Sequence, residues 1–171
     1  KLLKLDDPRF IDSAGVSINI FGMGVQLGHN EKDLGQYDRL YPITSGLAAA
    51  LVVKNKLFAK IGGFDEDFFM LSEDGDLCWR IWLSGYKVYS CPRSIVYHKG
   101  GSARLRQGSE RNYYFSLRNR IIMLVKNLSL PLIVISVPLT LTYLFVRGLI
   151  CRYDPAYFKA LIKAIKWNLK N

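Results

Sequence analysis

The sequence predicts a mixed α/β fold followed by C-terminal helices that associate with a membrane. Residues 10–98 alternate between short strand-like runs and short helical runs. Residues 128–146 contain no charged side chain, and residues 155–171 form a lysine-rich amphipathic helix. The chain has 171 residues, of which 50% are hydrophobic, so it can bury a core, and intrinsic disorder is excluded.

Charge is divided unevenly along the chain. Residues 1–85 hold nine Lys or Arg against twelve Asp or Glu, whereas residues 86–171 hold fifteen against two. The net charge of +10 therefore combines −3 in the first half with +13 in the second. A strongly basic segment usually faces an anionic partner, either nucleic acid or membrane lipid. Composition alone leaves both open.

The three cysteines, Cys78, Cys91 and Cys151, fit no Cys-x-x-Cys or Cys/His metal spacing. A disulfide scaffold is therefore not expected, and reduced thiols indicate a cytosol-facing chain. Together with the apolar segment, this predicts a membrane-associated or single-pass protein at the cytoplasmic side of the cell membrane. The chain begins at Lys1 without a signal-like segment, which we interpret as a fragment or a processed form.

We expect residues 1–109 to form one α/β domain. Its elements follow from apolar periodicity and from the positions of glycine and proline. They are a strand within 10–20, a loop at 21–45, a buried strand at 46–53, a helix at 54–61, a helix at 74–85, strands at 87–92 and 94–98, and a polar basic loop at 99–109. The Gly62-Gly63 pair is expected to end the first helix, and Gly85 the second.

Three segments follow this domain: a closing helix at 110–127, an apolar segment at 128–150 and a basic amphipathic helix at 151–171. The apolar segment reaches the lower length limit for a membrane-spanning helix. Because Pro131 and Pro138 lie within it, two shorter interfacial helices remain an alternative, as does a buried core helix.

The last helix has an apolar stripe opposite a lysine face. The stripe consists of Phe158, Leu161, Ile162, Ile165 and Leu169, and the lysines are Lys159, Lys163, Lys166 and Lys170. This pattern is typical of a helix that lies on an anionic membrane. The alternative is a surface helix that packs its stripe on the protein core. The neighbouring apolar segment favours the membrane.

Six acidic residues crowd into twelve positions: Asp65, Glu66, Asp67, Glu73, Asp74 and Asp76. Like charges at this density repel unless a metal, basic side chains or a bound hydroxyl substrate compensates. Helix capping explains part of the cluster, but more carboxylates stand at the helix start than one cap requires. A calcium loop is excluded because Phe69 and Met70 occupy positions that need an oxygen ligand and a glycine.

His98 ends a predicted strand and precedes a glycine-containing loop. That position suits a metal ligand or a phosphate contact, and a half-exposed structural histidine is the plain alternative. The glycines of residues 22–28 imitate a dinucleotide-binding fingerprint, but their spacing is off by one. No zinc-finger, RNA-recognition or homeodomain signature appears in the sequence.

Several motifs, taken in order, resemble the second half of family 2 glycosyltransferases. They are Thr44-Ser45-Gly46-Leu47-Ala48, Ile61-Gly62-Gly63-Phe64-Asp65-Glu66, Ser72-Glu73-Asp74-Gly75-Asp76-Leu77-Cys78-Trp79-Arg80, Val96-Tyr97-His98 and Arg118-Asn119-Arg120. The resemblance covers residues 10–127 and is closest to the rhamnosyltransferase-like and archaeal members. It implies the C-terminal, acceptor half of a GT-A Rossmann-like fold, followed here by the membrane-associated helices.

The resemblance also implies an activity, in which a sugar moves from a nucleotide-sugar donor to an acceptor with inversion. Asp74 would be the general base that deprotonates the acceptor hydroxyl. Glu73, Asp76 and Trp79 would shape the site or contact a glycan or lipid-linked acceptor. Polysaccharide biosynthesis at a membrane surface would be the setting, with no nucleic-acid partner.

The leaving diphosphate has its own implied residues. His98 would complete the coordination of a Mg²⁺ or Mn²⁺ ion that neutralises the diphosphate. Arg104 and Arg106, on the loop that follows, would bind the phosphates directly, since guanidinium groups suit phosphate geometry.

The nucleotide-binding first half of the family, with its metal-binding Asp-x-Asp motif, has no counterpart in this sequence. We therefore expect a fragment or a split subunit that needs the missing N-terminal half, and no activity from this chain alone. Two other classes stay open. One is a non-catalytic membrane-associated module that binds a partner. The other is a basic nucleic-acid-binding domain, whose binding would depend steeply on salt.

Overall fold

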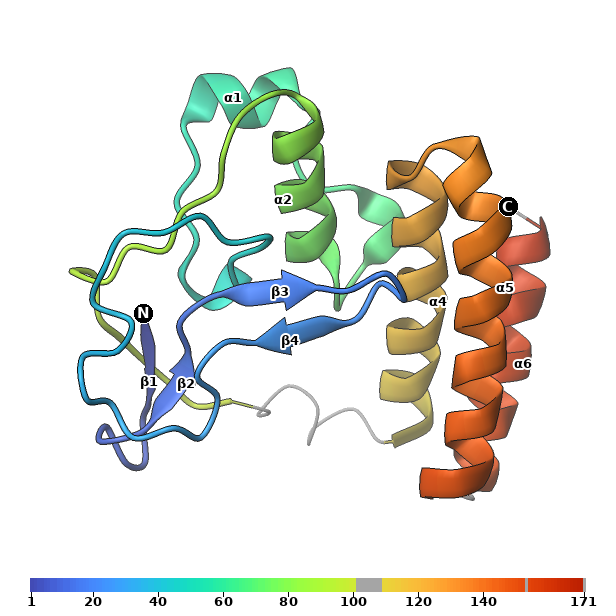
Figure 1. Cartoon of the computed structure of the whole chain (residues 1–171). Helices are drawn as coiled ribbons and strands as arrows, with labels where there is room; N and C mark the ends of the chain where they lie inside the picture. The colour runs from blue at the N-terminus through green and yellow to red at the C-terminus, as the bar shows by residue number, and fades with distance from the viewer. Residues whose placement is uncertain (101–108, 153, 171) are drawn as a thin grey trace. The chain divides into compact units, whose positions relative to one another are not determined.

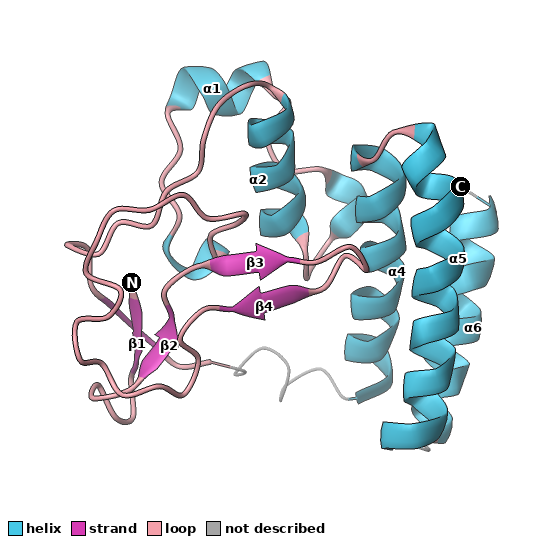
Figure 2. Ribbon diagram, in the orientation of Figure 1, coloured by secondary structure: helices cyan, strands magenta, loops and turns pink. Residues whose placement is uncertain are grey.

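A computed structural model of the chain describes residues 1–100, 109–152 and 154–170 (Figure 1). These residues divide into two compact units. The sheet unit comprises residues 1–19, 23–65 and 73–100, and the helical unit comprises residues 20–22, 66–72 and the described residues from 109 onward. The described strands, which are magenta in Figure 2, belong to the sheet unit. The mixed α/β class predicted from the sequence is confirmed, with two small sheets among the described residues.

Two small sheets organise the sheet unit. In the three-stranded sheet, β1 (Leu2–Lys4) lies between β2 (Ile11–Ser13) and β5 (Val96–His98). The β1 strand runs antiparallel to β2, with an irregular register at Leu2 and Leu3, and parallel to β5. The second sheet is an antiparallel ribbon of β3 (Val16–Ile18) and β4 (Gly24–Gln26).

The sheet unit also contains two α-helices. They are α1 (Asn55–Lys60) and α2 (Glu73–Leu83). The buried side of α2 carries Leu77, Cys78 and Ile81, which pack in one cluster with Ile43 and Val88. Leu77 and Ile81 are four residues apart and therefore lie on the same helix face.

Glycines end both helices as the sequence predicts. Gly62 and Gly63, after α1, have φ of 82° and 68°, and Gly85, after α2, has φ of 81°. These values fall in the left-handed region that glycine adopts without a steric penalty.

Three helices form most of the helical unit. They are α4 (Ser109–Asn127), α5 (Leu130–Arg147), which continues as a π-helical turn (Gly148–Arg152), and α6 (Pro155–Lys170). Figure 1 shows the three lying side by side. Their shared core contains Leu117, Leu144, Tyr157, Ala160, Leu161 and Ala164.

A buried amide holds the segment of residues 66–72, which begins with a 3₁₀ turn (Glu66–Phe68), to α4. The Asn119 side chain donates to the carbonyls of Phe68, Met70 and Leu71 at 2.8, 2.7 and 2.6 Å. This segment contains non-glycine residues with positive φ, including Leu71 at 67°. The side-chain hydrogen bonds offset the strain of that backbone.

The strand predicted at 46–53 is wrong. The structure has a 3₁₀ turn (Ala48–Ala50) there, followed by residues that join no described sheet, and Val52 is 97% exposed. The apolar run has the length of a buried strand. Its hydropathy does not show whether another strand is present to pair with it. Two smaller corrections are that β4 lies inside the predicted 21–45 loop, and that the 87–92 strand is reduced to one bridge between Pro42 and Tyr89.

The apolar segment forms one continuous helix, so the alternative of two shorter helices is wrong. Pro131 lies in the first turn of α5, where its missing N–H costs nothing, and Pro138 lies inside the helix. Residues 130–150 are long and apolar enough to span a membrane, and only 17% of their most apolar window is buried. That exposure argues against a buried core helix.

The last helix packs on a face shifted from the predicted stripe. Its buried residues are Tyr157, Ala160, Leu161 and Ala164, whereas Ile162 and Leu169 are 54% and 83% exposed. The small side chains of Ala160 and Ala164 allow α6 to approach the core closely. Hydropathy did not predict that they would be buried, because alanine is only weakly apolar. The helix therefore packs on the core with one face and still exposes apolar side chains of the predicted stripe.

Candidate functional site

Asp74 stands in the first turn of α2, where two backbone amides fix its carboxylate. Oδ2 accepts from the Ala48 N–H at 3.0 Å, and Oδ1 accepts from the Gly75 N–H at 2.8 Å. Burial raises the pKa of Asp74, although these hydrogen bonds act in the opposite direction. The carboxylate is rigid, half-buried and a better proton acceptor than an ordinary aspartate.

Glu73 lies next to Asp74 and is also half-buried. Burial raises the pKa of Glu73, and the neighbouring Asp74 charge raises it further. No described residue offers a hydrogen-bond partner to Glu73 Oε2, although this atom is buried. A buried acceptor without a partner is costly, so a donor from a bound molecule would be favourable here.

Asp76 faces a different environment from its two neighbours. Its carboxylate is fully buried and binds the Arg80 guanidinium at 2.7–2.8 Å, one helical turn along α2. Arg80 also donates to the carbonyls of Ile61 and Gly63 at 2.7 and 2.8 Å. Asp76, through Arg80, therefore anchors the glycine turn after α1 to α2. Its influence on binding of a sugar acceptor would act through the position of this turn.

Trp79 is half-buried on α2 and does not share the Asp74 face. It lies five residues after Asp74, which at 3.6 residues per turn is roughly 140° around the helix. The α2 tryptophan with a fixed partner is Trp82, whose indole N–H donates to the Ile43 carbonyl at 3.1 Å.

His98 ends β5 and binds a buried carboxylate from β2. Its Nδ1 lies 2.7 Å from Asp12 Oδ2. The second histidine, His29, places Nδ1 2.9 Å from the main-chain carbonyl of the same Asp12. Sequence reasoning found His98 but missed Asp12 and His29, whose contacts join positions 86 and 17 residues apart. The signal in the sequence that could have identified Asp12 was its charge inside a short strand-like run.

His98 fits a metal ligand as one member of a set. Its Nδ1 is occupied by a carboxylate, an arrangement that metal-bound histidines commonly have. Among the described residues, no group of three or more His, Cys, Asp or Glu side chains gathers to hold an ion. His98 would therefore supply one ligand, and the remaining ligands would come from elsewhere. The predicted diphosphate residues Arg104 and Arg106 lie outside the described residues.

A large apolar groove occupies the sheet unit, with a volume of about 730 Å³. Gly46 and Leu47 line it, and they directly precede the Ala48 amide that binds Asp74. The other aliphatic lining includes residues 51–53. The described lining of the groove contains no Asp or Glu, and its lysines are Lys54, Lys56, Lys60, Lys87 and Lys1, whose ammonium is paired with Asp33 and Asp38.

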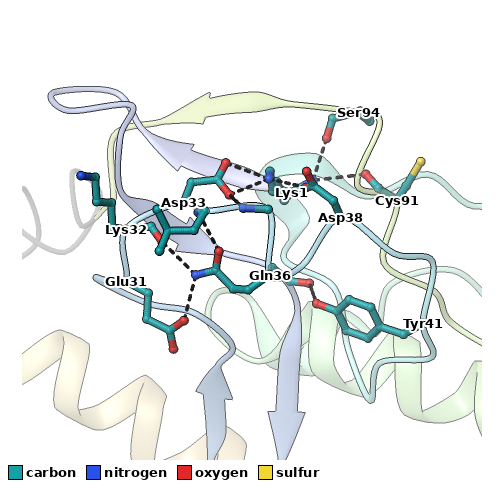
Figure 3. A network of polar contacts seen from close by, with 12 residues as sticks. Lys1, Glu31, Lys32, Asp33, Gln36, Asp38, Tyr41, Cys91 and Ser94 are labelled. Carbon is teal, nitrogen blue, oxygen red and sulfur yellow. Dashed lines mark hydrogen bonds and ion pairs between the residues drawn. The ribbon is translucent and has the colours of Figure 1, made fainter.

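Polar contacts converge on Lys1, which lines this groove (Figure 3). The Lys1 ammonium binds Asp33 at 2.7 Å and Asp38 at 2.5 Å. The main-chain nitrogen of Lys1 donates to the carbonyls of Cys91 and Ser94, which also line the groove. The loop that carries Asp33 and Asp38 is thereby held to β1.

No family model matches this chain. The chain is similar to the N-acetylglucosaminyl-diphospho-decaprenol L-rhamnosyltransferases of two Mycobacterium tuberculosis strains, CDC 1551 / Oshkosh and ATCC 25618 / H37Rv. In each case 38% of residues are identical over 55 positions, which cover 32% of this chain and 18% of the relative. The match thus spans less than a fifth of the relative's length. It supports a relationship to glycosyltransferases.

Proposed function

We propose that this chain is the acceptor half of an inverting family 2 glycosyltransferase of GT-A fold. The observation that carries the proposal is the rigid carboxylate of Asp74, raised in pKa and fixed at a helix start by two amides. The partial match to a rhamnosyltransferase supports the same class of reaction.

In the proposed reaction, an acceptor hydroxyl lies against Asp74. Its proton moves to the carboxylate as the oxygen bonds to the anomeric carbon of the donor sugar, and configuration at that carbon inverts. The bond from that carbon to the phosphate oxygen breaks, and the electron pair leaves with the nucleoside diphosphate. Glu73 Oε2 accepts a second hydroxyl and orients the acceptor. A Mg²⁺ or Mn²⁺ ion, when bound at His98, would neutralise the leaving diphosphate.

The proposed acceptor is lipid-linked. The similar mycobacterial proteins are described as acting on an N-acetylglucosaminyl-diphospho-decaprenol. The exposed apolar surface of α5 would keep the site near such a substrate, with α5 spanning or lying on the membrane. We propose the cytoplasmic side of the membrane and anionic lipid as the partner of the basic helices, with no nucleic-acid partner.

The nucleotide would be bound by an N-terminal half outside this sequence, so this chain alone would be inactive. The apolar groove supports that partner. Its residues 51–53 join no described strand, and its described lining carries lysines but no Asp or Glu. A polypeptide strand with acidic flanks would complement both features.

Transfer is tested in the protein that carries this sequence, with nucleotide-activated L-rhamnose as donor and N-acetylglucosaminyl-diphospho-polyprenol as acceptor. Asp74→Asn should lower kcat by about 10²–10⁴-fold, the usual contribution of a general base. Glu66→Gln, an exposed carboxylate of the same acidic stretch, is the matched control and should keep full activity. Unchanged turnover in D74N would overturn the base assignment and favour the non-catalytic module.

A further inference from the structure

Asp12 is a charged residue in a buried strand. It is 5% exposed, in the middle of β2, between the fully buried Ile11 and Ser13. Burying a carboxylate costs free energy unless it is well hydrogen-bonded. The two strands that pair with β1 carry this carboxylate and His98, and thus bring them together from opposite ends of the unit's sequence.

The chemistry of the partners fixes where the histidine protons lie. An ionised carboxylate and a carbonyl only accept hydrogen bonds. Nδ1 of His98, facing Asp12 Oδ2, and Nδ1 of His29, facing the Asp12 carbonyl, are therefore both donors. In the neutral ring the proton then sits on Nδ1, and Nε2 carries the lone pair.

The chain after His98 also stays close to this carboxylate. A Cβ built on Gly100 would lie 3.3 Å from Asp12 Oδ1. Glycine at this position thus allows the backbone beyond β5 to approach the carboxylate more closely than most side chains permit.

We propose that Asp12 is a positioning residue, which holds His98 in the Nδ1–H tautomer and presents Nε2 as a ligand for a divalent cation. The sequence leaves a metal ligand and a phosphate contact open for His98. A lone pair on Nε2 favours the cation, because a phosphate oxygen needs a donor. The cation's role in sugar transfer rests on the proposed function, but the tautomer and the metal contact do not.

The tautomers are measured by ¹⁵N NMR of the chain labelled at histidine, which has only two such residues. At pH 8.5, where histidine is ordinarily neutral, both rings should show a protonated Nδ1 and a bare Nε2. Asp12→Asn should change the His98 signals more than those of His29, whose Nδ1 donates to the main-chain carbonyl of Asp12 at 2.9 Å and lies 3.6 Å from Oδ1 of the Asp12 carboxylate. A proton on Nε2 of His98 in the unmodified chain would overturn the proposal, whether or not D12N folds.

Metal contact is measured in the same samples by adding Mn²⁺. The signals of His98 should broaden more than those of His29, and D12N should need about 10–100-fold more Mn²⁺ for the same broadening. Inorganic phosphate in place of Mn²⁺ should leave the His98 signals unchanged. A shift with phosphate, or equal broadening in D12N, would contradict the cation assignment.

The proposed function and the role of Asp12 can fail separately. If the tautomer and the Mn²⁺ contact hold but D74N retains transfer, the proposed function is wrong and the role of Asp12 stands. If D74N abolishes transfer but His98 has the other tautomer, the general base stands and the role of Asp12 is wrong.

Discussion

At the scale of single residues, Glu73 and Asp74 share a raised pKa but differ in their partners. Asp74 is held by two backbone amides, whereas no described residue reaches Oε2 of Glu73. The fixed carboxylate of Asp74 suits a general base, which must keep one geometry. The unpartnered Oε2 of Glu73 suits an acceptor of a hydrogen bond from a substrate hydroxyl. These roles lead to different pH predictions.

The rate of transfer should depend on ionised Asp74. Because burial raises its pKa, the carboxylate is protonated at a higher pH than an ordinary aspartate. Activity should therefore fall as pH decreases, with the acidic limb of kcat/KM above the ordinary aspartate pKa of about 4. A profile that is flat down to pH 4 would contradict the assignment of Asp74 as base.

Activity should fall as pH decreases, whereas the contribution of Glu73 to folding stability should rise as pH decreases. Its pKa is raised in the folded state, so its favourable contribution is present below the unfolded pKa and is lost as pH rises through the folded pKa. Glu73→Gln cannot ionise and should raise Tm more at pH 7.5 than at pH 4.

Thermal unfolding in mild detergent at both pH values checks this prediction. Glu66→Gln, at an exposed carboxylate, should leave Tm unchanged at both. A larger gain for E73Q at pH 4 than at pH 7.5 would contradict the sign.

The Asp76–Arg80 pair should be a stability determinant. Arg80→Met leaves the fully buried Asp76 carboxylate without its guanidinium and removes two hydrogen bonds to the turn after α1. Urea unfolding should show a loss of about 3–5 kcal/mol. Arg9→Met, at an exposed pair with Asp7, is the matched control and should show no measurable change. Equal effects of the two variants would exclude an anchoring role.

Whether a contact between two side chains can be predicted from the sequence depends on how far apart the two residues are in the chain. Asp76 and Arg80 are four apart on a helix, so their pairing is readable from spacing. Crowding at the start of α2 pointed to Glu73 and Asp74. The Asp12–His98 contact joins residues 86 positions apart through strand pairing, and no local sequence pattern predicts it.

At the scale of elements, the two faces of α6 have different roles. Leu161 packs in the helical core, whereas its neighbour Ile162 is 54% exposed. Leu161→Ala should cost about 2–5 kcal/mol in urea unfolding, the range for a buried leucine. Ile162→Ala should stay within about 0.5 kcal/mol. A similar loss for both would mean that the packed face of α6 is wider than the structure shows.

Elements with strong periodicity and clear end signals were predictable. The glycines after α1 and α2 mark real helix ends, and the helix predicted at 110–127 is α4. The run 46–53 was not predictable, because a strand needs a partner that hydropathy does not supply. The face of α6 was misplaced because buried alanines carry little hydropathy signal.

At the scale of the whole molecule, the exposed apolar surface of α5 should govern membrane attachment. We expect the chain to float with anionic vesicles and not to retain duplex DNA at physiological salt. Val134→Asp with Leu139→Asp should reduce flotation more than tenfold, since each Asp costs about 2.5–3.5 kcal/mol near the centre of a membrane helix. Val52→Asp, at an exposed apolar residue of the sheet unit, should leave flotation unchanged. DNA binding without vesicle binding would overturn this placement.

The uneven charge of the chain has a place in this account. The acidic first half contains the carboxylates of the proposed base site. In the basic second half, residues 86–146 carry a net +8 and residues 147–171 a net +5. We propose that the first of these faces the diphosphate and the second faces anionic lipid. The boundaries predicted at 109, 127 and 150 remain predictions.

The central claim is that Asp74 is the base of a sugar transfer, and kcat of the D74N variant tests it most directly. We expect kcat of D74N to be about 10²–10⁴-fold lower in the transfer assay. The E66Q control should keep full activity, and the D74N variant should keep the fold and vesicle binding of the unmodified protein. Turnover of D74N equal to that of the unmodified protein would contradict the account.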